Sequence, residues 1–356
     1  MDTKTQRFID RVYDDGLKGA MPSKETLLDL LALDPCSEET AHLKRRASDM
    51  AHAVAGGKAR IAGAVGIDYV PCSMNCSFCS FGEKWGVIER EVAYTEDEVI
   101  ELVRSYVEQG ATTVTLRSTE FYDLDVLQDW IADIREQVPG CYEINMNVGE
   151  LTPERARAIW ECGATSAYHV IRLREGIDTP FDVEQRKETV RSITGSPLLW
   201  GTCLEPIGPE HTDEELTDQV LFGLEQGAYC GGVMARVPVP GTPFEGTEMI
   251  GQDRLLQILA AVRLAAGSRY ESMGCHPAIE EALYAGANSI TVESGTNPRD
   301  IEPDKKPWKG LSVADAKALL EKAGFEVALP TDAPRVCSTP RQKTGDHPSK
   351  PVGRCC

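Results

Sequence analysis

The chain has 356 residues and a formal net charge of −19 at pH 7, and 42% of its residues are apolar. A charge this negative repels polyanions, so we expect neither nucleic acid nor an anionic membrane surface as a partner. No apolar run is long enough to span a bilayer, and the first residues lack the apolar stretch of a signal peptide. Twelve cysteines without an export signal indicate a reducing compartment, where thiols bind metals or serve catalysis. We therefore expect a cytoplasmic protein.

Residues 1–60 are predicted to be helical. An apolar stripe at helical spacing runs from Leu27 to Leu33, and Pro22-Ser23 directly before it is a helix start signal. A second helix is expected over residues 38–55, ending at Gly56-Gly57. We interpret these helices as a lid across one end of a barrel rather than as a separate domain.

Residues 61–295 alternate short β-rich runs with amphipathic helices, which is typical of βαβ units around a parallel sheet. Capping boxes at Thr95–Glu98 and Thr212–Glu215 mark the start of two of these helices. Eight strand–helix pairs predict an α/β protein, a full (β/α)8 barrel of the TIM type with its active face at the C-terminal ends of the strands. The predicted strands are residues 64–70, 112–116, 142–148, 166–173, 197–204, 229–237, 268–273 and 289–292.

The C-terminal part divides into two segments. Residues 296–330 are expected to form a polar linker and a final helix. Residues 331–356 change to a basic, proline-containing composition, which predicts a flexible tail that ends in Cys355-Cys356.

Three cysteines, Cys72, Cys76 and Cys79, follow the first predicted strand at CxxxCxxC spacing. A [4Fe-4S] cluster usually takes four cysteines, so three local thiolates leave one iron without a protein ligand and open to chemistry. The alternative is a structural zinc site, which needs four closed ligands and often uses two CxxC pairs. Because the chain has no second CxxC pair, the spacing favours the cluster.

This loop, with aromatic Phe78 directly before the last cysteine, resembles the signature of the radical S-adenosylmethionine (SAM) superfamily. The resemblance implies that SAM chelates the open iron. It also implies that an electron from the reduced cluster splits SAM into methionine and a 5′-deoxyadenosyl radical, which abstracts hydrogen from an unactivated carbon. An electron donor such as flavodoxin or ferredoxin would be a partner.

Further segments are similar to SAM-binding positions of that superfamily. Glu120, after the second predicted strand, would receive the SAM amino group, and its place beside the cysteine loop favours this over the alternative, an acid at a helix start. Arg172, Arg174 and Glu175 end the fourth strand and would hold the SAM carboxylate or ribose, whereas the alternative is a surface ion pair. Together with Phe78, these residues are the expected cofactor contacts.

The segments Arg236–Phe244 and Ala285–Ile290, with the N-terminal helices, resemble the biotin-synthase-like branch. That branch holds biotin synthase, hydrogenase maturases, methylornithine synthase and a two-protein lipoyl synthase system. Sulfur insertion in this branch consumes an auxiliary cluster. The sequence departs from the biotin synthase pattern, because Cys203 has no matching set of inward cysteines on the second and third strands.

A different auxiliary cluster is one hypothesis, in which the tail folds over the barrel mouth. Its ligands would come from Cys275, after the seventh strand, and from Cys337, Cys355 and Cys356. The other hypothesis is that the tail pair only takes up metal or sulfur, or is idle.

Our first expectation is sulfur insertion of the lipoyl-synthase type on a small-molecule or carrier-protein-bound substrate. The alternative within the superfamily is rearrangement or metallocofactor maturation without sulfur transfer. Two alternatives from other classes are a zinc-stabilised binding module and a metal- or sulfur-delivery protein that uses Cys355-Cys356.

Overall fold

The computed structural model describes residues 2–303, 305 and 310–329. The α-helices are α1 (Thr3–Leu17), α2 (Lys24–Leu31), α3 (Glu38–Val54), α4 (Glu96–Glu108), α5 (Leu124–Gln137), α6 (Pro153–Cys162), α7 (Val183–Thr194), α8 (Asp213–Glu225), α9 (Gln252–Ala266) and α10 (Val313–Lys322). The 3-10 helices are η1 (Glu83–Trp85), η2 (Gly267–Arg269) and η3 (Glu280–Ala285). The strands are β1 (Lys58–Gly66), β2 (Asp68–Tyr69), β3 (Val92–Ala93), β4 (Thr113–Arg117), β5 (Glu143–Asn147), β6 (Ser166–Tyr168), β7 (Leu199–Gly201), β8 (Leu204–Ile207), β9 (Cys230–Ala235), β10 (Ser272–His276), β11 (Ser289–Gly295) and β12 (Glu326–Val327).

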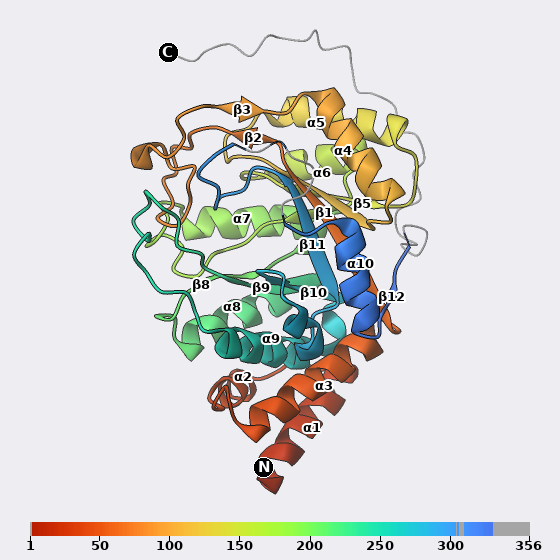
Figure 1. Ribbon diagram of the computed structural model, residues 1–356, viewed down its shortest axis with the longest axis vertical. Coiled ribbons are helices and arrows are strands. Elements are labelled where there is room, and N and C mark those ends of the chain that lie inside the picture. The colour runs from red at the N-terminus through yellow and green to blue at the C-terminus, as the bar shows by residue number, and fades with distance from the viewer. Residues whose placement is uncertain (1, 304, 306–309, 330–356) are drawn as a thin grey trace.

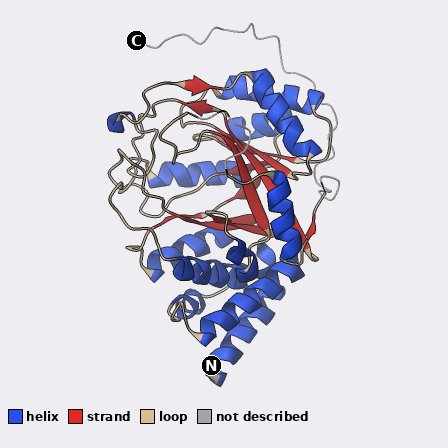
Figure 2. Ribbon diagram, viewed as in Figure 1, coloured by secondary structure: helices blue, strands red, loops and turns tan. Residues whose placement is uncertain are grey.

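A curled parallel sheet forms the centre of the molecule, with helices outside it (Figures 1 and 2). Its order is β10-β9-β7-β6-β5-β4-β1-β11, and β8 pairs with β9 as well. β7 and β8 are the two halves of the predicted fifth strand, interrupted at Thr202 and Cys203. The α/β class and the eight parallel strands in barrel order are therefore confirmed.

β10 and β11, the two ends of the curled sheet, meet without the regular strand pairing found between the other neighbouring strands. These two strands end the sheet path and share no paired register. Instead, the backbone N–H of Asn288 donates to the carbonyl of Met273 at 3.0 Å. The Asn288 side chain accepts from the Met273 N–H at 2.9 Å and from the buried Arg263 guanidinium at 2.8 Å. One asparagine thus replaces part of a strand ladder.

Helix starts follow the local sequence signals. Thr95 with Glu98, and Thr212 with Glu215, form the predicted capping boxes, in which each side chain bonds to the other residue's backbone. Thr152 caps α6, and Pro153 occupies its first turn, where a missing N–H costs nothing. These caps set where each helix leaves the barrel rim.

The N-terminal helices α1–α3 pack against α8, α9, η2 and η3, and Figure 1 shows them gathered at one end of the molecule. The Gln257 side chain of α9 donates to the carbonyls of Leu30, Leu31 and Leu33, which are left open at the end of α2. Apolar side chains of α1–α3 belong to the same hydrophobic core as the barrel helices.

Several predicted boundaries are wrong. β1 begins at Lys58, so the expected division at residue 60 falls inside a strand. β10 spans Ser272–His276 rather than 268–273, because residues 267–269 turn in a 3-10 helix. The pair Cys275-His276, expected after this strand, therefore lies within it. Within the described ranges, no helix is long and apolar enough to cross a membrane.

Asn288→Ala tests the junction. It would leave the Met273 N–H and one Arg263 N–H buried without an acceptor, so we expect a loss of about 2–5 kcal/mol of stability. Asn288→Asp is the matched control, because it keeps the acceptor, and we expect a smaller loss. Chemical denaturation followed by circular dichroism measures both, and equal stability of Asn288→Ala and wild type would contradict this role.

Candidate active site

The cysteine loop lies at the C-terminal end of β1, beyond the short β2–β3 pair. The backbone N–H of Cys72 donates to the carbonyl of Phe81, and the N–H of Glu83 donates to the carbonyl of Cys72 at 3.1 Å. The Cys79 N–H donates to the carbonyl of Cys76 at 3.0 Å. The loop therefore folds back on itself, so that the first and last cysteines belong to one closed turn.

Hydrogen bonds to other segments of the chain hold this loop in place. The Ser80 N–H and hydroxyl both donate to the carbonyl of Pro298, at 2.9 and 3.1 Å. The Ser77 N–H donates to the carbonyl of Asp178 at 2.9 Å, and the Trp85 indole donates to the carbonyl of Cys76 at 3.1 Å. The cysteines are thus held by segments that follow β11 and β6.

The three thiols are in an environment that disfavours negative charge. Burial raises the pKa of Cys76 to about 11 and that of Cys79 to about 12, and neighbouring cysteines add to both effects. The backbone N–H of Phe81 points at the Cys79 sulfur at 3.4 Å. Bound cationic iron would supply the charge that makes three adjacent thiolates stable here.

The arrangement fits a cluster better than one metal ion. Within the described ranges, no three His, Cys, Asp or Glu side chains are arranged to hold a single ion. Cluster cysteines each bind a different iron, so they need not converge on one point. The residues present therefore fit a [4Fe-4S] cluster with three protein ligands.

One cavity of about 330 Å³ runs from this loop through the barrel. Cys72, Cys76, Cys79 and Phe78 line it at the C-terminal end of the strands. At the other end it reaches Arg60, whose guanidinium pairs with Glu143 at 3.3 Å and Glu271 at 3.0 Å. The cavity thus extends over the whole depth of the sheet.

Besides Phe78, two more of the expected SAM contacts line the cavity beside the cysteines, namely Glu120 and Arg172. Burial raises the pKa of Glu120 to about 7, against the lowering effect of Arg186 and Arg172. Nη1 of Arg172 is buried and makes no hydrogen bond among the described residues, although it lies 3.7 Å from the Glu175 carboxylate. An unsatisfied guanidinium N–H next to the cysteine loop suits a carboxylate ligand.

The other two expected contacts do not line the cavity. Arg174 has a positive φ of 56° and its side chain pairs with Asp178 at 3.2 Å. Glu175 is buried, accepts from the Arg172 backbone N–H at 2.8 Å and from the Thr179 hydroxyl, and so holds the turn that carries Arg172.

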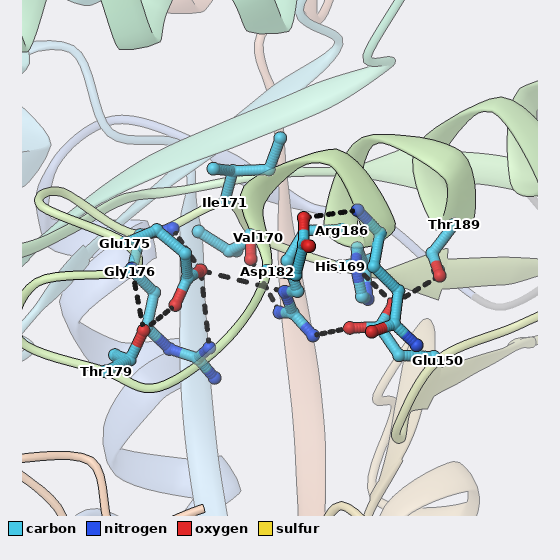
Figure 3. A network of polar contacts seen from close by, with 12 residues as sticks. Glu150, His169, Val170, Ile171, Glu175, Gly176, Thr179, Asp182, Arg186 and Thr189 are labelled. Atoms are coloured by element: carbon cyan, nitrogen blue, oxygen red, sulfur yellow. Dashed lines mark hydrogen bonds and ion pairs between the residues drawn. The ribbon is translucent and has the colours of Figure 1, made fainter.

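Arg186 of α7 is a buried cavity residue that the sequence analysis did not identify (Figure 3). Its Nη1 donates to Glu150 at 3.0 Å, and its Nη2 donates to the carbonyl of Val170 at 2.6 Å. Its Nε lies 3.6 Å from Glu175. One guanidinium therefore ties together the loops that follow β5 and β6.

A second charged group lines the opposite part of the cavity. Arg117 of β4 and Arg299 both bond to Glu293 of β11, and His276 of β10 lies nearby, where burial lowers its pKa. Arg117 appeared in the sequence only as the residue before Ser118. The missed signal was its position at the end of a strand, where barrel side chains point inward or toward a ligand.

The expected auxiliary ligand Cys275 is in the wrong place for that role. On β10 the residues Ser272, Gly274 and His276 line the cavity, whereas Cys275 packs in the hydrophobic core. Alternate residues of a strand face opposite sides of the sheet, which explains the difference. The remaining expected ligands, Cys337, Cys355 and Cys356, lie outside the described residues.

A parallel barrel that carries three nearby cysteines after its first strand, above a cavity lined by both charged and apolar side chains, is suited to hold an iron–sulfur cluster. The family model described as "Radical SAM superfamily" matches residues 68–217, which include the cysteine loop, Glu120 and Arg186. This part of the chain is therefore a radical SAM domain, and members of that superfamily use a [4Fe-4S] cluster and SAM and require an electron donor.

Its relatives fall in the biotin-synthase-like group. Biotin synthase of Renibacterium salmoninarum is 25% identical over 88% of this chain and 92% of the relative. Biotin synthase of Persephonella marina is 24% identical over 72% of this chain and 78% of the relative. The [FeFe] hydrogenase maturase subunit HydE of Thermotoga maritima is 24% identical over 64% of this chain and 65% of the relative.

Solved structures share the fold at lower identity. Methylornithine synthase (PylB) is 18% identical with a TM-score of 0.75, covering 90% of this chain and 98% of that chain. The hydrogenase maturase HydG is 13% identical with a TM-score of 0.76, covering 91% of this chain and 76% of that chain.

Cys76→Ser tests the cluster site. After anaerobic reconstitution we expect about four irons per wild-type chain and a large loss of iron and of visible absorption in the variant. Cys36→Ser, an exposed cysteine on the N-terminal region, is the control and should load like wild type. Full loading of Cys76→Ser would refute the assignment.

Proposed function

We propose that this radical SAM enzyme abstracts a hydrogen atom from a small, polar substrate held inside the barrel, without sulfur transfer. The observation that carries the proposal is the charged lining of the cavity. Arg60–Glu143, Arg117–Glu293 and Tyr168–Glu205 are bonded pairs that face it.

When bound, the reduced cluster splits SAM and supplies the 5′-deoxyadenosyl radical that abstracts hydrogen. The chain's own residues hold and orient the groups around that chemistry. Cys72, Cys76 and Cys79 would hold three irons, and Glu120 would accept from the SAM ammonium group. Arg172, with its open Nη1, would bind the SAM carboxylate. Glu175 would keep Arg172 in position through the turn described above.

The polarity of the substrate distinguishes hydrogen abstraction without sulfur transfer from sulfur insertion of the lipoyl type. Burial of a long acyl chain, as in the lipoyl-type reaction, is favourable beside apolar side chains. It is not favourable where the chain must displace water from ion pairs. A compact polar substrate would replace that water with hydrogen bonds. The cavity volume of about 330 Å³ is at the small end of ligand pockets, which also supports a compact molecule.

Sulfur insertion is the second candidate, and the biotin synthase relatives favour it. It would require an auxiliary cluster, for which Cys275 faces the wrong side of β10. A one-electron donor such as flavodoxin or ferredoxin is a proposed partner in either case.

SAM cleavage tests the main proposal. Reconstituted protein with dithionite and SAM should form 5′-deoxyadenosine. Arg172→Met should raise the SAM concentration needed for half-maximal cleavage about tenfold or more, because a charge-assisted bond worth about 1.5–3 kcal/mol is lost. Arg104→Met, a partly exposed arginine on the barrel exterior, is the control. No 5′-deoxyadenosine from iron-loaded wild type would end the proposal.

The sulfur question has its own test. We expect about four sulfides per chain, and the same sulfide content in the full-length variant with Cys337, Cys355 and Cys356 changed to serine. About six to eight sulfides in wild type, reduced to four in the triple variant, would instead support an auxiliary cluster and sulfur insertion.

A further inference from the structure

Arg117, Glu293 and Arg299 form a charged group that the SAM-binding roles above do not use. Arg117 ends β4 and Glu293 lies in β11, on either side of β1. Between them, Ala64 of β1 is paired in register with Glu293 and with Thr115. Its small side chain faces the cavity, so the ion pair can cross in front of β1.

The group has more positive than negative charge. One Glu293 oxygen accepts from Arg117 Nη1 at 3.0 Å, and the other accepts from Arg299 Nη2 at 2.9 Å. Two guanidinium groups therefore share one carboxylate. Burial would raise the pKa of Glu293, but its attraction to Arg117 and Arg299 holds that pKa at about 2, so the carboxylate stays ionised at neutral pH.

Other arginines of the cavity have at least one carboxylate for each guanidinium group. Arg60 lies between the carboxylates of Glu143 and Glu271. Arg186 and Arg172 together pair with Glu150 and Glu175. The Arg117–Glu293–Arg299 group differs in its ion pairs, because two guanidinium groups share one carboxylate, although Asp68 also attracts Arg117.

Two of its donors also lack a good acceptor. Nε of Arg117 is buried with no hydrogen-bond partner within the described ranges. Nη1 of Arg299 has the thioether sulfur of Met234 at 3.8 Å, which is a weak acceptor for a charged donor. His276 of β10 faces the same space, and burial lowers its pKa, so it adds no positive charge at neutral pH. One donor from each arginine is therefore left for a ligand.

We propose that Arg117 and Arg299 form the subsite that binds a carboxylate of the substrate, with Glu293 bonded to both guanidinium groups and neutralising one of their two charges. The inference rests on the proposed function, because it assigns a substrate class to the same cavity. One unmatched positive charge suits a monoanionic carboxylate better than a phosphate dianion. Arg117 ends β4 three residues before the SAM contact Glu120, whereas Glu293 lies in β11 and Arg299 follows it, so the substrate carboxylate would lie beside SAM, in front of β1 and between β4 and β11.

Butyrate and its uncharged analogue butyramide are the probes. Isothermal titration of full-length, reconstituted, SAM-loaded protein should show butyrate binding at least tenfold tighter than butyramide. Arg117→Met and Arg299→Met should each weaken butyrate at least tenfold, and Arg299→Lys should restore part of the loss. Arg155→Met, an arginine paired with Asp125 on the outer helices, should bind like wild type.

Glu293→Gln separates a binding role from a structural one. Removing the carboxylate frees a second positive charge, so this variant should bind butyrate several-fold more tightly than wild type. If the three residues only braced the barrel, the variant would instead bind no better or more weakly. Circular dichroism checks that each variant folds. The arginine variants, and the comparison of the two probes on wild type, test the subsite even if Glu293→Gln does not fold.

Equal binding of butyrate and butyramide by wild type would overturn the inference. Unchanged butyrate affinity in both arginine-to-methionine variants, or weaker binding by folded Glu293→Gln, would do the same. Formation of 5′-deoxyadenosine by wild type is a separate readout. Its presence without selective butyrate binding would reject the subsite alone, and its absence would reject the proposed function.

Discussion

Charge neutralisation inside the barrel is the constraint on which the rest of this structure depends. An ion buried without a partner costs several kcal/mol, so charged side chains in the cavity lie beside counter-charges from other segments. Arg60 pairs with two carboxylates at one end of the barrel, and Arg186 pairs with two near the other end. These pairs join strands and loops that are not neighbours in the sheet, and they place charged groups in the interior that an apolar core could not offer to a ligand.

The cysteine loop depends on the same principle. The three thiols, whose pKa values desolvation raises, are poor anions until cationic iron is present, so the loop is suited to a metal cluster. Bonds from Ser80 and Ser77 to segments after β11 and β6 hold it over the cavity. The open iron of the superfamily would therefore face the enclosed space where Glu120 and Arg172 lie.

A shared barrel fold does not fix which side chains line its cavity. The fold is shared with methylornithine synthase and HydG at TM-scores of 0.75 and 0.76, although the identities are 18% and 13%. A fold held in common does not specify a substrate, because the reaction is set by inward side chains. In this chain, Arg117 and Arg299 share the carboxylate of Glu293, and this group would give the cavity a preference for a substrate carboxylate.

Local signals in the sequence determined the CxxxCxxC loop, the capping boxes and the eight strands, because each depends on residues close together in the chain. They did not determine which residues meet inside the barrel. Arg186 bonds to Glu150 across 36 positions, and Arg117 bonds to Glu293 across 176. Cys275 faces the core because strand register decides which alternate residues point inward, and a boundary misplaced by a few residues hides that choice. Only the closed sheet, by setting that register, brings together charges that no local pattern connects.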